Sequence, residues 1–353
     1  MTRTVEWDYN RGQLRLIDQR ILPGDYRVMI YNDYRDVADA IREMVVRGAP
    51  AIGVTAAFGL ALAARHSKAR TRAALLVELR AAADQLQKAR PTANNLSWAL
   101  KWMLAAAEAQ AVDVAPNLLR IAILEEAQKL ADEDVRTNQE MAFFGASLID
   151  DGDTIIHHCN TGSLAAVDWG TALGVIRMAH EQGKHIHVLV DETRPRLQGA
   201  RLTAWELQQY GIPYDIIADG ASGYFLSSGQ VQKVFFGADR VAANGDVANK
   251  IGTYMLALAA HDNQIPVYPV VPISTIDIAT PDGKAIPIEE RTQQEVLALS
   301  YDGQPVFPNG ASARNPAFDI TPNRLVTAIV TEVGIIDPPF KRNLRKAVEG
   351  KLK

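Results

Sequence analysis

The chain has 353 residues, 48% of them hydrophobic and 22% charged, which is ordinary for a globular protein and long enough for two domains. Its 37 basic and 41 acidic residues give a net charge of −4, so no charge excess favours nucleic acid or an anionic membrane. The first residues lack the apolar core of a signal peptide, and the longest uncharged apolar run, 49–64, is too short to span a bilayer. We therefore expect neither nucleic acid nor a membrane as a partner, and we interpret the run as a buried helix.

The first half of the chain has the pattern of helices. Apolar residues recur at three- and four-residue spacing from residue 33 to about residue 148, with much alanine and leucine. Before this region, residues 14–32 favour one or two strands around the turn at Pro23-Gly24. We predict a mainly helical N-terminal domain with a short β segment over residues 1–148.

The pattern changes at the turn-rich junction 151–153, where short apolar runs begin to alternate with helical stretches. Such alternation indicates parallel strands joined by right-handed crossovers, so the predicted fold class is α/β, with a doubly wound sheet over residues 149–353. The predicted strands are 154–157, 185–190, 214–218, 231–236 and 266–270, and the predicted helices are 164–182, 198–210 and 251–263.

Small and polar residues follow several of the predicted strands. Because open parallel sheets bind ligands beyond the carboxyl ends of their strands, these residues mark the expected position of a site. One crevice is predicted to hold Cys159, Asp191, Gln198, Asp239, Asn249 and Lys250.

Cys159 is the only cysteine in the chain. An intramolecular disulfide is therefore impossible, and a cysteine-based metal cluster within one chain is excluded. A reducing compartment, hence the cytoplasm, is the expected location. A lone cysteine is usually a small buried hydrophobic residue, so a chemical role for Cys159 has to be argued from its surroundings.

Common nucleotide and metal motifs are absent from the sequence. It has no G-x-G-x-x-G after a strand, no G-x-x-x-x-G-K-[ST] and no H-E-x-x-H. His185 and His187 alternate on a predicted strand, but no carboxylate stands at an obvious ligand spacing, so we predict no metal site. We interpret His157 and His158 as structural, with a role in tuning the adjacent thiol left open.

Three segments have features of anion binding. Residues 47–50 (Arg-Gly-Ala-Pro) precede the apolar run, and Pro50 suits the first turn of a helix. Unpaired N–H groups at a helix start, next to an arginine, suit a phosphate. Lys250, at the start of a second predicted helix, and residues 90–92 are further candidates. Each cation alone is more commonly a solvated surface residue, so this prediction depends on their combination.

Short segments in order along nearly the whole chain resemble the methylthioribose-1-phosphate isomerase family. The matching segments are Val5-Glu6-Trp7, RGAPAIG at 47–53, RPTANNL at 90–96, CNTGSL at 159–164, ETRP at 192–195, QGARLTA at 198–204, GADRVAANGD at 237–246, ANKIGTY at 248–254 and NPAFDITP at 315–322.

The resemblance implies a fold, an activity and a set of site residues. The fold is a helical N-terminal domain followed by a Rossmann-like one, shared with ribose-1,5-bisphosphate isomerases and with regulatory subunits of translation initiation factor 2B. The activity is aldose–ketose isomerisation of 5-methylthioribose 1-phosphate to 5-methylthioribulose 1-phosphate in methionine salvage, a route of methionine biosynthesis. Family members are commonly homodimers that need no metal or organic cofactor. By position, Cys159 and Asp239 match the catalytic pair, and the residues that match substrate- and phosphate-binding positions are Arg47, Gly48, Ala49, Arg90, Gln198, Asn249 and Lys250.

The chemistry of this substrate suggests roles for the catalytic pair. Because the anomeric oxygen carries phosphate, ring opening needs a proton on the ring oxygen as its bond to C1 breaks. We hypothesise that Asp239, kept protonated by an apolar and closed pocket, supplies that proton. Hydrogen then moves from C2 to C1, either by proton transfer with Cys159 as a thiolate base or by a direct hydride shift, and the sequence leaves both routes open.

Two other functions stay open at this point. The chain could be an isomerase for 5-deoxyribose 1-phosphate or ribose 1,5-bisphosphate, or a non-catalytic regulatory subunit that senses a sugar phosphate or nucleotide. Residues 219–225 depart from the family, whose members often carry small residues and a histidine there, which leaves the preferred 5-substituent open. The presence of both Cys159 and Asp239 argues for catalysis over binding alone.

Overall fold

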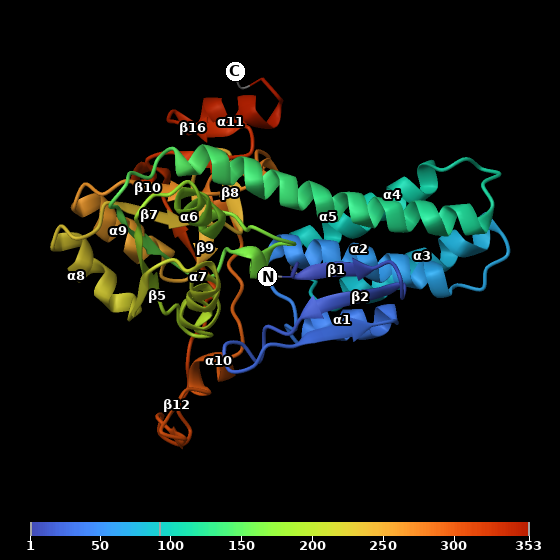
Figure 1. The fold of residues 1–353 in the computed structure, drawn as a ribbon, viewed down its shortest axis with the longest axis horizontal. Helices are drawn as coiled ribbons and strands as arrows, with labels where there is room; N and C mark the ends of the chain where they lie inside the picture. The colour runs from blue at the N-terminus through green and yellow to red at the C-terminus, as the bar shows by residue number, and fades with distance from the viewer. Residues whose placement is uncertain (1, 92, 352–353) are drawn as a thin grey trace. The chain divides into compact units, whose positions relative to one another are not determined.

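The computed structural model describes residues 2–91 and 93–351, which form two compact units (Figure 1). The first unit contains the residues up to Thr137 together with Gly162–Gly170, and the second contains Asn138–Thr161 together with the residues from Thr171 onward. The division between the two units falls inside a helix. The domain boundary predicted from the sequence lies between residues 148 and 149, and it stays a prediction.

The first unit is built around one buried helix, α2 (Ala49–His66). This helix is rich in alanine and glycine, so its neighbours approach it closely, and the interpretation of residues 49–64 as a buried helix is confirmed. In the part of the chain that the structure describes, no helix has both the length and the hydropathy needed to cross a membrane. The elements around α2 are β1 (Val5–Asp8), β2 (Gln13–Ile17) and β3 (Val28–Tyr31) in one antiparallel sheet, and α1 (Tyr34–Arg42), α3 (Arg72–Gln87), α4 (Asn94–Ala109) and α5 (Pro116–Ala146), the last of which continues into the second unit.

The second unit contains the predicted parallel sheet. Its five strands lie in the order β10-β7-β4-β5-β6, and every neighbouring pair is parallel. Within this sheet the chain passes first through β4, continues outward through β5 and β6, and then returns to the other side of β4 as β7. The strand order therefore reverses between β4 and β7, which is where such sheets bind ligands. The strands are β4 (Thr154–His157), β5 (His187–Asp191), β6 (Tyr214–Ile217), β7 (Lys233–Phe236) and β10 (Val267–Pro269).

Alternate residues of these strands pack against helices on opposite faces of the sheet. Ile155 and Phe235 belong to one apolar cluster, which includes residues of α6 and α7, whereas Ile156 and Phe236 belong to another, which includes residues of α8 and α9. Both faces are thus covered, as expected for a doubly wound sheet. The helices are α6 (Ala172–Glu181), α7 (Ala204–Tyr210), α8 (Ser222–Ser227) and α9 (Thr253–Asp262).

A second, smaller sheet in this unit was not predicted. Residues 240–250, between the predicted strand 231–236 and the predicted helix 251–263, form β8 (Arg240–Ala242) and β9 (Val247–Lys250), an antiparallel pair around a turn that contains Gly245 at φ 91°. Lys250 therefore ends a strand and does not begin a helix. The sheet order is β11-β8-β9-β14, with β11 (Ile276–Asp277) and β14 (Phe318–Thr321) as its other strands.

Two predicted helices differ from the structure at their starts. The helix predicted from residue 164 begins only at Ala172, because Trp169 and Gly170 both have positive φ and turn the chain before it. The helix predicted from residue 198 is present, with a π-helical first turn. The remaining elements are η1 (Ser163–Ala165), η2 (Gly199–Thr203), η3 (Asp219–Ala221), η4 (Ile273–Thr275), η5 (Gly283–Ala285), α10 (Gln294–Leu297), β12 (Ser300–Tyr301), β13 (Gln304–Pro305), η6 (Asn323–Leu325), β15 (Ile329–Thr331), β16 (Gly334–Ile336) and α11 (Phe340–Val348).

Truncating a side chain at the centre of the parallel sheet tests the packing of the second unit. Phe235 is fully buried, and the centroid of its ring lies 5.1 Å from that of the Tyr268 ring. We expect Phe235→Ala to lower the free energy of unfolding by about 3–5 kcal/mol, measured by urea denaturation, because it leaves a cavity between strand and helices. Phe143→Ala, at a position that is 63% exposed, is the matched control and should cost no more than about 1 kcal/mol. Equal losses for the two variants would contradict the described packing.

Candidate active site

Cys159 lies just beyond the carboxyl end of β4, with its backbone in the left-handed region at φ 67°. This conformation costs a residue other than glycine roughly 1 kcal/mol or more, so the surroundings have to hold it. The Cys159 N–H donates to Thr193 Oγ1 at 2.9 Å, and its C=O accepts from Thr203 Oγ1 at 2.7 Å. Hydrogen bonds to both its N–H and its C=O therefore hold the backbone of Cys159, and the residue is only 6% exposed.

Thr193, just beyond β5, is strained in the same way. Its φ is 63°, which is a rare value for a β-branched residue. The Thr193 hydroxyl donates to the C=O of Asp191 at 2.9 Å, and its N–H donates to Asp219 Oδ1 at 2.7 Å. Strained positions on two adjacent strand ends, each held by hydrogen bonds, are typical of a functional site.

Asp239 lies between β7 and β8. Its N–H donates to the C=O of Ala248 at 2.9 Å, which brings it beside the end of β9. A Cβ at Gly237 would lie 2.9 Å from Thr161 Cγ2, so the segments that follow β7 and β4 touch. Asp239 is exposed in the bend between these two strands, which differs from the expectation that it is enclosed in an apolar pocket.

Three predicted binding residues of the second unit are buried near these strand ends. Gln198 precedes η2 and is 7% exposed, and its Oε1 has no hydrogen-bond partner among the described residues. Asn249 Nδ2 donates to Thr253 Oγ1 at 2.9 Å. Lys250 Nζ donates to the C=O of Ala317 at 2.9 Å. A buried amide oxygen without a donor costs about 1–3 kcal/mol, so Gln198 is suited to a ligand that donates a hydrogen bond.

The start of α9 does not offer the anion site that we expected beside Lys250. The Asp319 carboxylate accepts hydrogen bonds from the N–H of Gly252 at 2.7 Å and of Tyr254 at 3.0 Å. A carboxylate at this end of a helix already satisfies the groups that would bind a phosphate. Burial raises the pKa of Asp319. The prediction of a helix-start anion site at Lys250 is therefore wrong.

The other predicted binding residues, Arg47, Gly48, Ala49 and Arg90, belong to the first unit. Helix α2 begins at Ala49, with Pro50 in its first turn as predicted, and its N-cap Gly48 makes no side-chain capping bond. Glycine is required at position 48, because φ is 94° and a Cβ would lie 2.3 Å from the carbonyl oxygen of Ala165. Residue 92 of the predicted 90–92 segment lies outside the described residues.

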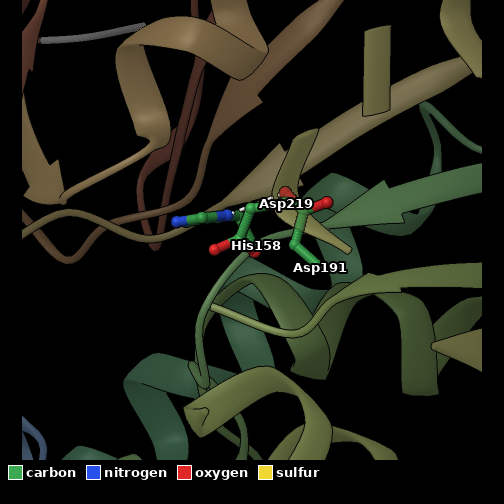
Figure 2. Close-up of side chains that lie close together, drawn as sticks. All are labelled: His158, Asp191 and Asp219. Carbon is green, nitrogen blue, oxygen red and sulfur yellow. Dashed lines mark hydrogen bonds and ion pairs between the residues drawn. The ribbon is translucent and has the colours of Figure 1, made fainter. Parts of the chain in front are cut away.

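His158 forms a buried pair with Asp191 that was not predicted from the sequence (Figure 2). His158 Nδ1 lies 2.8 Å from Asp191 Oδ2, and its Nε2 lies 3.0 Å from the C=O of Ile251. A carbonyl oxygen only accepts, so Nε2 carries a proton, and Nδ1 also donates, to the carboxylate, in the imidazolium form of the ring that a raised pKa of His158 favours. Burial lowers the pKa of His158, but the hydrogen bond and charge of Asp191, aided by Asp219, outweigh burial and raise it.

The ligand atoms of His158, Asp191 and Asp219 all lie within 4.8 Å of one another, as a metal centre would require (Figure 2). Each of these residues, however, already bonds to groups of the chain. Asp219 accepts from the N–H of Thr193 and of Arg194, both at 2.7 Å, and Asp191 accepts from the Ser222 hydroxyl. We interpret the cluster as a hydrogen-bonded support for the strand ends.

His157 has a different environment from its neighbour. Its Nδ1 donates to the C=O of Phe235 at 3.0 Å, and its Nε2 accepts from the Thr161 hydroxyl at 3.3 Å. Burial lowers the pKa of His157 to about 3, so it is neutral at physiological pH. These contacts support its structural interpretation. His185 and His187 pair separately with Asp151 at 3.0 Å and Asp215 at 2.9 Å.

The family to which the chain belongs is shown by comparison with known proteins. The model of the initiation factor 2 subunit family matches residues 45–338, which is more than half of the chain, so the chain is of this class. Two relatives named methylthioribose-1-phosphate isomerase, from Pelotomaculum thermopropionicum and a Synechococcus strain, are 51% and 52% identical to the chain. The alignments cover 99% and 96% of this chain, and 95% and 96% of those proteins. The chain therefore belongs to the methylthioribose-1-phosphate isomerase family.

Solved structures agree with this assignment. A 5-methylthioribose 1-phosphate isomerase from Pyrococcus horikoshii OT3 superposes with a TM-score of 0.93 at 44% identity, over 99% of this chain and 96% of that one. A protein from A. fulgidus described as translation initiation factor eIF-2B, subunit delta, has a TM-score of 0.89 at 42% identity, over 99% of this chain and all of that one. The predicted fold, a helical unit followed by a Rossmann-like sheet, is confirmed.

The lowered pKa of His157 predicts a pH dependence of stability. A histidine whose pKa falls from 6.5 to about 3 on folding contributes stability that is fully present above pH 6.5 and is lost as the pH falls toward 3. At 1.36 kcal/mol per unit, roughly 2–3 kcal/mol should be lost between pH 6.5 and 4.5. Urea denaturation of the wild type and of His157→Gln at both pH values measures this loss, and His187→Gln is the control. The same pH dependence in wild type and His157→Gln would contradict the assignment.

Proposed function

We propose that the chain is an aldose–ketose isomerase that converts 5-methylthioribose 1-phosphate to 5-methylthioribulose 1-phosphate in methionine salvage. The observation that supports this most is that the segments carrying Cys159 and Asp239 follow the adjacent strands β4 and β7, on the two sides of the point where the strand order reverses. The resemblance of the chain to isomerases over nearly its whole length points to the same reaction. We further propose that the protein works as a cytoplasmic homodimer, as the resemblance implies.

The residues proposed to bind the substrate have complementary chemistry. The unpartnered Oε1 of Gln198 suits a sugar hydroxyl, which would donate to it. Asn249 and Lys250, buried at the end of β9, add an amide and a cation. Arg47 and Arg90, with the backbone of Gly48 and Ala49 at the start of α2, are proposed to bind the phosphate.

Asp239 is proposed to start the reaction as a general acid. Because the residue is exposed in the chain alone, we propose that the bound sugar covers its carboxyl and takes it out of water. Desolvation disfavours the carboxylate and keeps the proton available. Asp239 then gives this proton to the ring oxygen as the bond from that oxygen to C1 breaks, and the electron pair of the bond stays on the oxygen.

Cys159 is proposed to assist the transfer of hydrogen from C2 to C1. In one route its thiolate removes the C2 proton, an enediol-like intermediate forms, and the proton is returned to C1. In the other route a hydride moves directly from C2 to C1, and Cys159 stabilises the charge that develops. In either route the C2 hydroxyl gives its proton to the Asp239 carboxylate as the ketone forms, and the phosphate stays on C1, so no external oxidant or reductant is needed.

A second candidate function is a regulatory subunit that binds a ligand without turnover, favoured by the similarity to the A. fulgidus protein. An assay of the purified chain with 5-methylthioribose 1-phosphate, 5-deoxyribose 1-phosphate and ribose 1,5-bisphosphate separates the candidates. We expect the highest kcat/KM with the methylthio sugar. A preference for another sugar would replace the proposed substrate, and binding of all three without turnover would support the regulatory function.

The proposed acid is tested by Asp239→Asn, which keeps the shape of the side chain and removes the proton donor. We expect turnover to fall by at least ~100-fold, the usual scale for an acid–base group, with the Kd of the substrate changed by less than about threefold. Asp215→Asn, at an exposed carboxylate of β6, is the control and should retain full activity. Near-normal turnover by Asp239→Asn would reject the role of this residue as the acid.

The role of Cys159 is tested by Cys159→Ser and by isotope exchange. The serine variant should lose at least ~100-fold in kcat, because a hydroxyl is a much weaker acid than a thiol and does not act as its anion at neutral pH. A reaction run in deuterium oxide then distinguishes the two routes. Solvent deuterium at C1 of the product would favour proton transfer, and its complete absence would favour the hydride shift. A serine variant as active as the wild type would reject the involvement of Cys159.

A further inference from the structure

We propose that His158 is a positioning residue of this enzyme: paired with Asp191, it holds the segment of Cys159 and the end of β9 in the relative placement that the isomerisation needs. The proposal depends on the proposed function, because the residues it positions, Cys159 on one side and Asn249 and Lys250 on the other, are those proposed for catalysis and substrate binding.

The hydrogen bonds of His158 join two segments that belong to different sheets. His158 directly precedes Cys159, after β4 of the parallel sheet. Its Nε2 donates to the C=O of Ile251 at 3.0 Å, and Ile251 directly follows Lys250, the last residue of β9 in the smaller sheet. The imidazole also packs closely on the next residue, since a Cβ at Gly252 would lie 2.9 Å from His158 Cε1. The ring therefore sets the distance between the two segments.

Asp191 holds both His158 and Cys159. Its carboxylate accepts from His158 Nδ1 at 2.8 Å, and its backbone C=O accepts from the Thr193 hydroxyl, which itself accepts the N–H of Cys159. The consecutive residues 158 and 159 are thus fixed from one strand end. Asp219 and Ser222, from the segment that departs from the family pattern, complete this support by bonding to Thr193 and Asp191.

The same contacts argue against a direct chemical role for His158. Both ring nitrogens are engaged, one with Asp191 and one with Ile251, so neither is available to a substrate. The side chains of His158 and Asp191 are 1% and 2% exposed, respectively. Removing either partner leaves a buried polar group or charge without its partner, so the segments are expected to shift. A misplacement of about 1 Å is enough to reduce turnover by about 100-fold.

The experiment compares His158→Ala and His158→Gln with the wild type, using steady-state kinetics with 5-methylthioribose 1-phosphate on protein whose fold is checked by circular dichroism. The alanine variant should lose at least ~100-fold in kcat/KM, with KM raised at least ~5-fold. The glutamine variant keeps an amide donor for Ile251 and should recover at least ~10-fold of that loss. His187→Ala breaks the His187–Asp215 pair, which has the same residue types but is exposed, and should stay within about twofold of the wild type.

KM is the readout that separates positioning from a loss of folded protein. A smaller folded fraction lowers the apparent kcat and leaves KM unchanged, so an unchanged KM in His158→Ala overturns the proposal, as does wild-type activity of that variant. If His158→Ala does not fold, His158→Gln decides by the same criterion, with a KM raised at least ~2-fold expected. A wild-type chain that does not isomerise the sugar would reject the proposed function itself, and the positioning role with it.

Discussion

The reversal of strand order between β4 and β7 is the constraint from which the site follows. Both strands run in the same direction, so the segments that follow them leave the sheet at the same edge. The chain then continues from β4 toward β5 and from β7 toward β10, on opposite sides of this pair. Cys159 follows β4 and Asp239 follows β7, so the two residues proposed for catalysis come after the two strands at which the order reverses. Strain is concentrated at this edge, where Cys159 and Thr193 have positive φ, and buried hydrogen bonds stabilise it.

Much of this arrangement could be predicted from the sequence, because buried parallel strands appear as continuous apolar runs between helices. All five strands of the parallel sheet were predicted in this way. The hairpin of β8 and β9 was missed, since its strands are short and its turn is rich in polar residues. The start of α6 was placed too early, because the turn at Trp169 requires a positive φ that residue type does not indicate.

The support behind the site could not be predicted, since it depends on contacts between distant segments. Asp219 and Ser222 looked like a departure from the family pattern, yet they bond to Thr193 and Asp191. The sequence marked His158 only as a neighbour of the thiol, and its bond to Ile251, 93 positions away, appears only in three dimensions. Asp239 was expected in a closed pocket but is exposed, so in this account the sugar itself has to complete the environment of the acid.

The most direct test of this account is a crystal structure of the wild-type protein with the product, 5-methylthioribulose 1-phosphate, bound. We expect the Cys159 thiol and the Asp239 carboxyl to lie within about 3–4 Å of the same sugar, with the carboxyl covered by it. A sugar bound elsewhere, or an Asp239 carboxyl that stays in solvent and out of reach of the sugar, would contradict the central claim.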